Sequence, residues 1–84
     1  MYGEISPQTL ELLRKERVRQ FQKFGHEPIA NPFQAITIFG EELGEACAAL
    51  NQAQGEDNFR KEVKQLAACC IAYLDNDLHF GNEP

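Results

Sequence analysis

A repeated helix-start signal constrains this chain more than any other feature. Ser6 is followed by Pro7, and Asn31 is followed by Pro32. Serine and asparagine are preferred N-cap residues because their side-chain oxygen accepts a hydrogen bond from a first-turn backbone N–H. Proline suits the first helical position because the N–H that it lacks has no partner there. The two pairs therefore predict two helix starts.

Helix-start and helix-stop signals together divide the chain into three predicted helices. The first covers residues 7–24, the second runs from Pro32 to near Gly55, and the third runs from around Asp57 to about Asn76. No stretch alternates polar and apolar residues between hairpin turn residues, so strands are not expected. The predicted fold class is an all-α helical bundle.

The chain is short enough to hold only one hydrophobic core. Its 84 residues weigh 9.5 kDa, which is too little for two cores. A hydrophobic share of 43% and a charged share of 25% place it among globular sequences. We expect residues 1–84 to form a single domain.

Charge and hydropathy argue against two classes of partner. Thirteen acidic and eight basic residues give a net charge of −5, which repels the phosphates of polymeric nucleic acid. No apolar run approaches the roughly 20 residues that span a bilayer. The opening residues MYGEISPQT also lack the pattern of a signal peptide. We therefore expect no nucleic-acid polymer and no membrane as partner, and a cytoplasmic location.

The three cysteines are predicted to be reduced core residues. Their number is odd, and Cys69 and Cys70 are adjacent, so these two cannot close an ordinary disulfide. Like Cys47, they lie among alanines and leucines, where a free thiol behaves as a small apolar group.

The second predicted helix has three different faces. Glu42 and Glu45 interrupt an apolar face that also carries Ile38 and Ala49. The expected core stripe is Phe39, Leu43, Ala46 and Leu50. The remaining side is a groove of small residues, namely Gly40, Gly44, Cys47 and Ala48. Because three helices are too few to enclose all these faces, we expect oligomerisation to complete the bundle, as a homodimer or a higher homo-oligomer.

The third predicted helix places Glu62 and Gln65 beside its apolar arc. The arc consists of Phe59, Val63, Ala67, Cys70 and Leu74. The opposite face is expected to lie in solvent and carries Arg60, Lys61, Lys64, Ala68 and Asp75.

The acidic residues of these two helices suggest a metal site. Glu42 and Glu45 are three residues apart, as are Glu62 and Gln65, and antiparallel packing would bring the two pairs together. Carboxylates among apolar residues must take up protons or bind a cation, and Mg²⁺ prefers oxygen ligands. The alternative is that the E-E-x-x-E pattern of residues 41–45 is an ordinary solvated helix face.

These segments resemble the MazG-like nucleotide pyrophosphohydrolases. The signature of that family is E-E-x-x-E followed after a short connection by E-x-x-D, and here it falls in ITIFGEELGEACAAL and FRKEVKQLAACCIAYLD. The upstream segment ERVRQFQKFG is similar to the R-Q-x-x-K-[FW]-G run of small members. The resemblance covers about residues 16–75, with Gln65 standing where aspartate is usual.

The resemblance implies an all-α enzyme that hydrolyses a nucleoside triphosphate, often a deoxynucleotide, to the monophosphate and pyrophosphate. The implied Mg²⁺ ligands are Glu42, Glu45, Glu62 and Gln65. The candidate catalytic bases are Glu41 and Glu45. The candidate triphosphate-binding residues are Gln20, Lys23 and Lys64.

Gln65 leaves two other functions open. A glutamine amide offers a carbonyl oxygen but no charge, so it holds a metal more weakly than aspartate and cannot act as a base. One alternative is a nucleotide-binding protein with reduced or lost catalysis. The other is a non-catalytic helical interaction module whose acidic residues lie on the surface.

Overall fold

The chain folds into three α-helices. In the computed structural model, which describes residues 3–25, 29–52 and 55–81, with residues 76–81 as helical backbone, the helices are α1 (Pro7–Phe24), α2 (Pro32–Asn51) and α3 (Glu56–Gly81). No strand occurs in these ranges. The all-α prediction with three helices is therefore confirmed.

Both predicted N-caps form as expected. The Ser6 side-chain oxygen accepts a hydrogen bond from the Thr9 backbone N–H at 3.1 Å. The Asn31 side chain accepts one from the Gln34 N–H at 2.9 Å. Each bond satisfies a first-turn donor that has no partner within the helix. The local sequence signal is thus sufficient to fix where α1 and α2 begin.

The boundary between α2 and α3 differs from the prediction. The second helix ends at Asn51, and Gly55 belongs to the start of α3, because its carbonyl accepts a hydrogen bond from the Phe59 N–H at 3.2 Å. Gly55 has a φ of 94°, in the left-handed region that favours glycine. It therefore cannot continue α2.

The third helix is also longer than predicted. It extends to Gly81, whereas the sequence pattern placed its end at about Asn76. Residues 77–80 contain neither glycine nor proline. Once a helix has formed, each further residue adds a hydrogen bond, so propagation continues until a helix-breaking residue appears.

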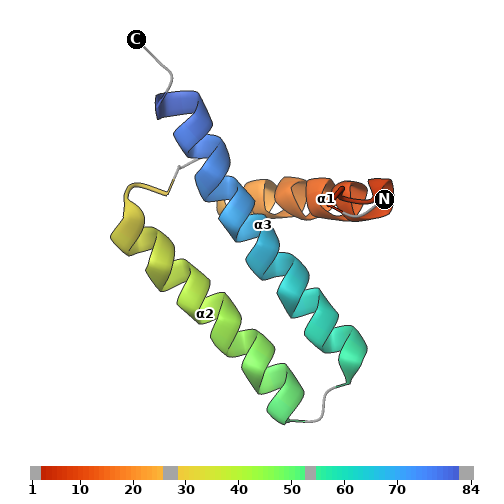
Figure 1. The fold of residues 1–84 in the computed structure, drawn as a ribbon. Coiled ribbons are helices and arrows are strands. Elements are labelled where there is room, and N and C mark those ends of the chain that lie inside the picture. Colours follow the sequence, from red (N-terminus) through yellow and green to blue (C-terminus); the bar gives the residue numbers. More distant parts are fainter. Residues whose placement is uncertain (1–2, 26–28, 53–54, 82–84) are drawn as a thin grey trace.

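Helix α3 is the element against which the other two pack. Figure 1 shows α2 and α3 side by side and antiparallel, while α1 crosses α3 at a steep angle. An edge-to-face aromatic pair joins α2 to α3, with the rings of Phe39 and Tyr73 6.4 Å apart. Arg17 of α1 reaches Asp75 of α3 at 3.2 Å.

The core is built mainly from small side chains. The buried apolar residues among those described are Ala35, Ala46, Ala49 and Ala68. Alanines allow helix backbones to approach closely, but they bury little apolar area. The predicted core stripe is correct for Ala46 and partly correct for the half-buried Phe39. It is wrong for Leu43 and Leu50, which are 54% and 61% exposed because α3 packs on another side of α2.

One face of α3 was predicted wrongly. Ala68 was expected in solvent, but it is fully buried. Lys64 and Asp75, expected on the same solvent face, each form an ion pair with a residue of α1. The reason is the crossing of α1, which covers a face that looks polar from periodicity alone.

Over the described ranges, none of the helices combines the length and apolar character that a transmembrane segment requires.

Candidate functional site

Three glutamates from two helices meet at one place. Glu42 and Glu45 lie on α2 and Glu62 on α3, and each contributes a carboxylate oxygen to a group in which all three atoms lie within 4.8 Å of one another. Spacing of three residues keeps Glu42 and Glu45 on one helix face. The antiparallel packing of α2 and α3 then brings Glu62 opposite them. We call these three residues the glutamate triad.

The triad is partly withdrawn from water. Glu42 and Glu62 are half-buried, and Glu45 is exposed. One oxygen of Glu42 and one of Glu62, Oε2 in each case, is buried and has no hydrogen-bond partner among the described residues. A buried polar atom without a partner carries a desolvation cost, and the cost is higher for a charged group.

The electrostatics of the triad follow from this burial. Burial raises the pKa of Glu42, and the nearby charges of Glu45 and Glu62 raise it further. Burial also raises the pKa of Glu62, with Glu45 as the next cause. Both effects disfavour the ionised carboxylate. Protonation of Glu42 and Glu62, or binding of a cation beside them, would therefore be favourable.

The donor atoms of the triad suit a hard divalent cation. All three side chains offer carboxylate oxygens, which Mg²⁺ prefers, and Glu42 and Glu62 each also have a buried oxygen, Oε2, without a hydrogen-bond partner among the described residues. A bound cation would offset both the desolvation and the mutual repulsion. The triad is therefore a group of residues able to hold such a cation, and Mg²⁺ itself stays a prediction.

The structure places the fourth predicted ligand, Gln65, on α3 and half-buried. Its backbone carbonyl accepts a hydrogen bond from the side-chain amide of Gln20 at 3.2 Å. The same amide also donates to the Cys69 sulfur at 3.6 Å. Gln20 therefore ties α1 to α3 close to the triad. The roles of Gln65 in metal binding and of Gln20 in triphosphate binding stay predictions.

The two candidate bases differ in position. Glu45 belongs to the triad, whereas Glu41 is exposed and lies outside it. Lys23 is exposed near the end of α1, with its Nζ 5.2 Å from the centre of the Phe24 ring. Its predicted role and that of Glu41 remain predictions.

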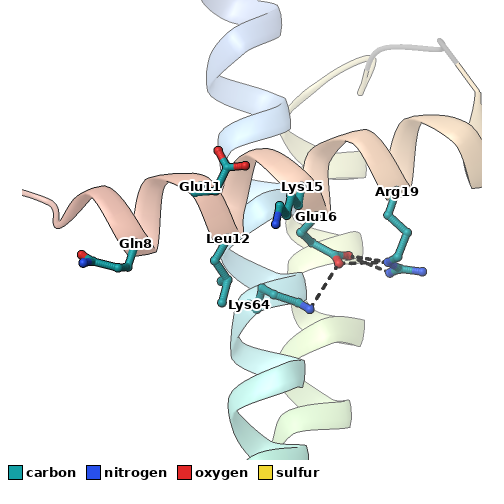
Figure 2. Close-up of a pocket in the computed structure, with 7 residues that line it drawn as sticks. All are labelled: Gln8, Glu11, Leu12, Lys15, Glu16, Arg19 and Lys64. Carbon is teal, nitrogen blue, oxygen red and sulfur yellow. Dashed lines mark hydrogen bonds and ion pairs between the residues drawn. The ribbon is translucent and has the colours of Figure 1, made fainter.

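An ion cluster formed by Glu16 and Arg19 of α1 and Lys64 of α3 was not anticipated from the sequence. Glu16 is buried to 2% exposure, which is rare for a charged residue. Arg19 donates to both of its oxygens, and Lys64 lies 3.7 Å away (Figure 2). The hydrogen bond from Arg19 is the main reason why the pKa of Glu16 lies below its usual value. The E-x-x-R spacing was a sequence signal for this pair, since residues three apart are neighbours on a helix.

The ion cluster forms one wall of an open pocket between α1 and α3. The pocket has a volume of about 520 Å³, and Figure 2 shows its lining residues, which are Gln8, Glu11, Leu12, Lys15, Glu16, Arg19 and Lys64. The triad is not part of this lining, but it lies within electrostatic reach. Besides burial and the other two triad carboxylates, Glu16 raises the pKa of Glu42 and Arg19 lowers it.

The cysteines only partly match their predicted role. All three are free, as expected, but Cys47 is exposed instead of buried, while Cys69 and Cys70 are half-buried. Burial raises the pKa of the Cys69 thiol to about 11, with the charge of Glu42 as the next cause. A thiol with such a pKa is protonated at neutral pH, which agrees with a packing role for Cys69.

Comparison of the chain with protein-family models, with curated proteins and with solved structures gave no match.

Proposed function

We propose that this protein is a Mg²⁺-dependent nucleoside triphosphate pyrophosphohydrolase that works as a homo-oligomer. Its expected substrate is a nucleoside triphosphate, with deoxynucleotides first among the candidates. The main support is the glutamate triad, in which carboxylate oxygens of Glu42, Glu45 and Glu62 lie within 4.8 Å of one another and two of the three side chains are half-buried. The resemblance of the sequence to MazG-like enzymes supplies the reaction type.

The triad carboxylates are the groups that would hold the cation, with Gln65 as the further candidate ligand. When bound, Mg²⁺ supplies charge neutralisation for the phosphate oxygens of a substrate. Glu42 and Glu62, being partly buried, suit metal binding. Glu45 is exposed, so it is also able to accept a proton from solvent.

The proposed hydrolysis assigns a step to Glu45. A water oxygen forms a bond to the α-phosphorus, and the bond from that phosphorus to the oxygen bridging to the β-phosphate breaks. The proton of the water passes to Glu45, or to Glu41 as the second candidate, and pyrophosphate leaves with the bonding electrons. The products are the nucleoside monophosphate and pyrophosphate.

Cations near the triad fit the charge of a triphosphate. Arg19 lies within electrostatic reach of Glu42, and Lys64 lies beside Arg19 in the same ion cluster. Both are partly exposed, with 45% of the Arg19 side chain and 29% of the Lys64 side chain accessible. Arg19 thus joins the sequence-based candidates Gln20, Lys23 and Lys64 for triphosphate binding.

A nucleotide-binding protein without catalysis is the second candidate function. The observation that favours it is Gln65, which provides no negative charge at the fourth ligand position. In that case the protein binds nucleotide with Mg²⁺ but releases no product.

The test is pyrophosphate release from a panel of ribo- and deoxynucleoside triphosphates, with and without Mg²⁺. We expect release that requires Mg²⁺ and stays linear with enzyme concentration. Nucleotide binding without release would support the second candidate. Neither binding nor release for any nucleotide would contradict both.

A further inference from the structure

A continuous apolar seam runs along α2 and is not covered by the rest of the described chain. Its residues are spaced alternately by three and four positions, the repeat that keeps a stripe on one side of a helix over several turns. The seam consists of Phe33, Ile36, Gly40, Leu43, Cys47 and Leu50. It spans nearly the whole of α2.

All six seam residues are exposed. Phe33 and Ile36 are 83% and 66% exposed, and Leu43 and Leu50 are each more than half exposed. Helix α3 packs instead against the alanine face of α2, which includes Ala35 and Ala49. Large contiguous apolar surfaces of this kind are typical of interaction sites.

The glycine in the seam indicates that a partner approaches closely. A mid-helix glycine costs about 0.8–1 kcal/mol relative to alanine. Among the described residues of one copy nothing uses the small size of Gly40, since a Cβ at that position would meet no atom within 4 Å apart from its chain neighbours and the nearby backbone of its own helix. The helix therefore bears this cost without benefit unless a side chain from another molecule fills the space.

We infer that the seam is covered by the same seam of a second copy of this chain, with the two α2 helices antiparallel about a two-fold axis between Gly40 and Leu43. This register pairs Gly40 with the partner's Leu43, Ile36 with the partner's Cys47, and Phe33 with the partner's Leu50. In the Gly40–Leu43 and Ile36–Cys47 pairs a large side chain faces a small residue, which allows close packing of the two helices. A parallel arrangement would instead place Gly40 against the partner's Gly40 and leave a void.

Charge and area agree with a second copy as occupant. The chain carries a net charge of −5, so two copies repel each other. This repulsion is weakest when the contact surface contains no acidic group. The seam contains no charged residue, and the positions that flank it in the repeat are uncharged too: Pro32, Thr37, Phe39, Gly44, Ala46 and Asn51. With roughly 100–150 Å² accessible on each large side chain, two seams bury on the order of 1,000 Å², which is the size of a small specific interface.

This inference rests only on the homo-oligomer part of the proposed function, not on hydrolysis. On the helix, Glu45 lies nearly opposite the seam, so both triads of the dimer remain accessible. Association and activity can therefore be measured as separate properties.

The first test compares two leucines of similar exposure. Leu43 in the seam is 54% exposed, and Leu74 on α3 is 58% exposed. In sedimentation velocity at micromolar concentration, we expect a dimer for the wild type and for Leu74→Lys. For Leu43→Lys we expect association at least about tenfold weaker, with unchanged helical circular dichroism. A monomeric wild type, or a dimer disrupted by Leu74→Lys and not by Leu43→Lys, would overturn the inference.

The second test fixes the register by a disulfide. Ile36→Cys should form an interchain disulfide with the partner's Cys47 under mild oxidation, and Ile36→Cys combined with Cys47→Ser should not. Residues 36 and 47 of one helix are about 16 Å apart along its axis, so they cannot bond within a copy. A wild-type dimer linked through Cys47 of both copies would contradict the antiparallel register with its axis between Gly40 and Leu43.

Discussion

Arg19 holds the buried carboxylate of Glu16 from one turn away, with its Nη2 2.6 Å from Oε2 and its Nε 2.9 Å from Oε1. The same helix contains a second pair with this spacing, Arg14 and Glu11, in which both side chains are largely exposed. The two pairs have similar hydrogen-bond lengths and differ in burial. They therefore provide an internal comparison of a buried and an exposed ion pair.

We predict that Arg19→Ala destabilises the protein and that Arg14→Ala does not. Loss of Arg19 leaves the buried carboxylate of Glu16 without its main partner, with Lys64 and Gln20 remaining beside it, and losing a hydrogen bond to a charged group costs about 1.5–3 kcal/mol. An exposed pair such as Arg14 with Glu11 contributes little to stability, because solvent screens its charges. Urea unfolding of the two variants measures the difference, and equal losses in both would contradict the account of the ion cluster.

Removing one negative charge from the triad should lower turnover without lowering the stability of the metal-free protein. We expect Glu42→Gln or Glu62→Gln to lower Mg²⁺-dependent turnover by about 100-fold or more, since metal stabilisation of a transition state amounts to several kcal/mol. Without metal, each variant should keep or raise the melting temperature, because it removes a partly buried like charge.

Glu4→Gln is the matched control for these variants. Glu4 is exposed and lies outside the helices, so its loss changes the net charge equally without touching the triad. We expect wild-type turnover from it. Unchanged turnover in both Glu42→Gln and Glu62→Gln would refute the assignment of the site.

The substitution Gln65→Asp tests the fourth ligand position. Aspartate adds a charged oxygen donor next to the triad, so we expect tighter Mg²⁺ binding and faster pyrophosphate release. Gln65→Asn changes the side-chain length by the same amount without adding charge, and it should give no gain. If Gln65→Asp and Gln65→Asn behave alike, then position 65 does not contribute to the metal site.

The metal-free protein should have a stability maximum at mildly acidic pH. Raised pKa values of Glu42 and Glu62 mean that the folded chain binds these protons more readily than the unfolded chain. The free energy of unfolding therefore increases as the pH falls from neutral through the raised pKa values. Glu16 acts in the opposite sense, because its pKa is lowered from 4.5, and its contribution is lost below that pH.

Chemical denaturation across this pH range, in the presence of a chelator, measures the predicted curve. In Glu42→Gln combined with Glu62→Gln, the gain on mild acidification should disappear while the loss at lower pH remains. A wild-type stability that falls steadily from neutral pH downward would contradict the raised pKa values.

Features set by neighbouring residues could be predicted from the sequence. The caps at Ser6 and Asn31 depend on bonds to residues three positions ahead, and the shared face of Glu42 and Glu45 depends only on helical spacing. The approach of Glu62 required one further assumption, namely that two helices joined by a short connection pack antiparallel.

Features set by the angle between helices could not be predicted. Periodicity identifies the apolar face of α3, but the steep crossing of α1 depends on which side chains fit together across the contact. Ala68 is buried for this reason, although the helix face on which it was expected also carries Lys64 and Asp75. The burial of Glu16 was missed for the same reason, since one of the cations that stabilise it, Lys64, comes from the crossing helix α3.

Mg²⁺ binding measured by isothermal titration calorimetry tests the central claim most directly. We predict saturable binding to the wild-type protein in the absence of nucleotide, unchanged binding to Glu4→Gln, and loss of the binding isotherm in Glu42→Gln and in Glu62→Gln. Wild-type protein that binds no Mg²⁺ with or without nucleotide, or triad variants that bind it as tightly as the wild type, would contradict the claim.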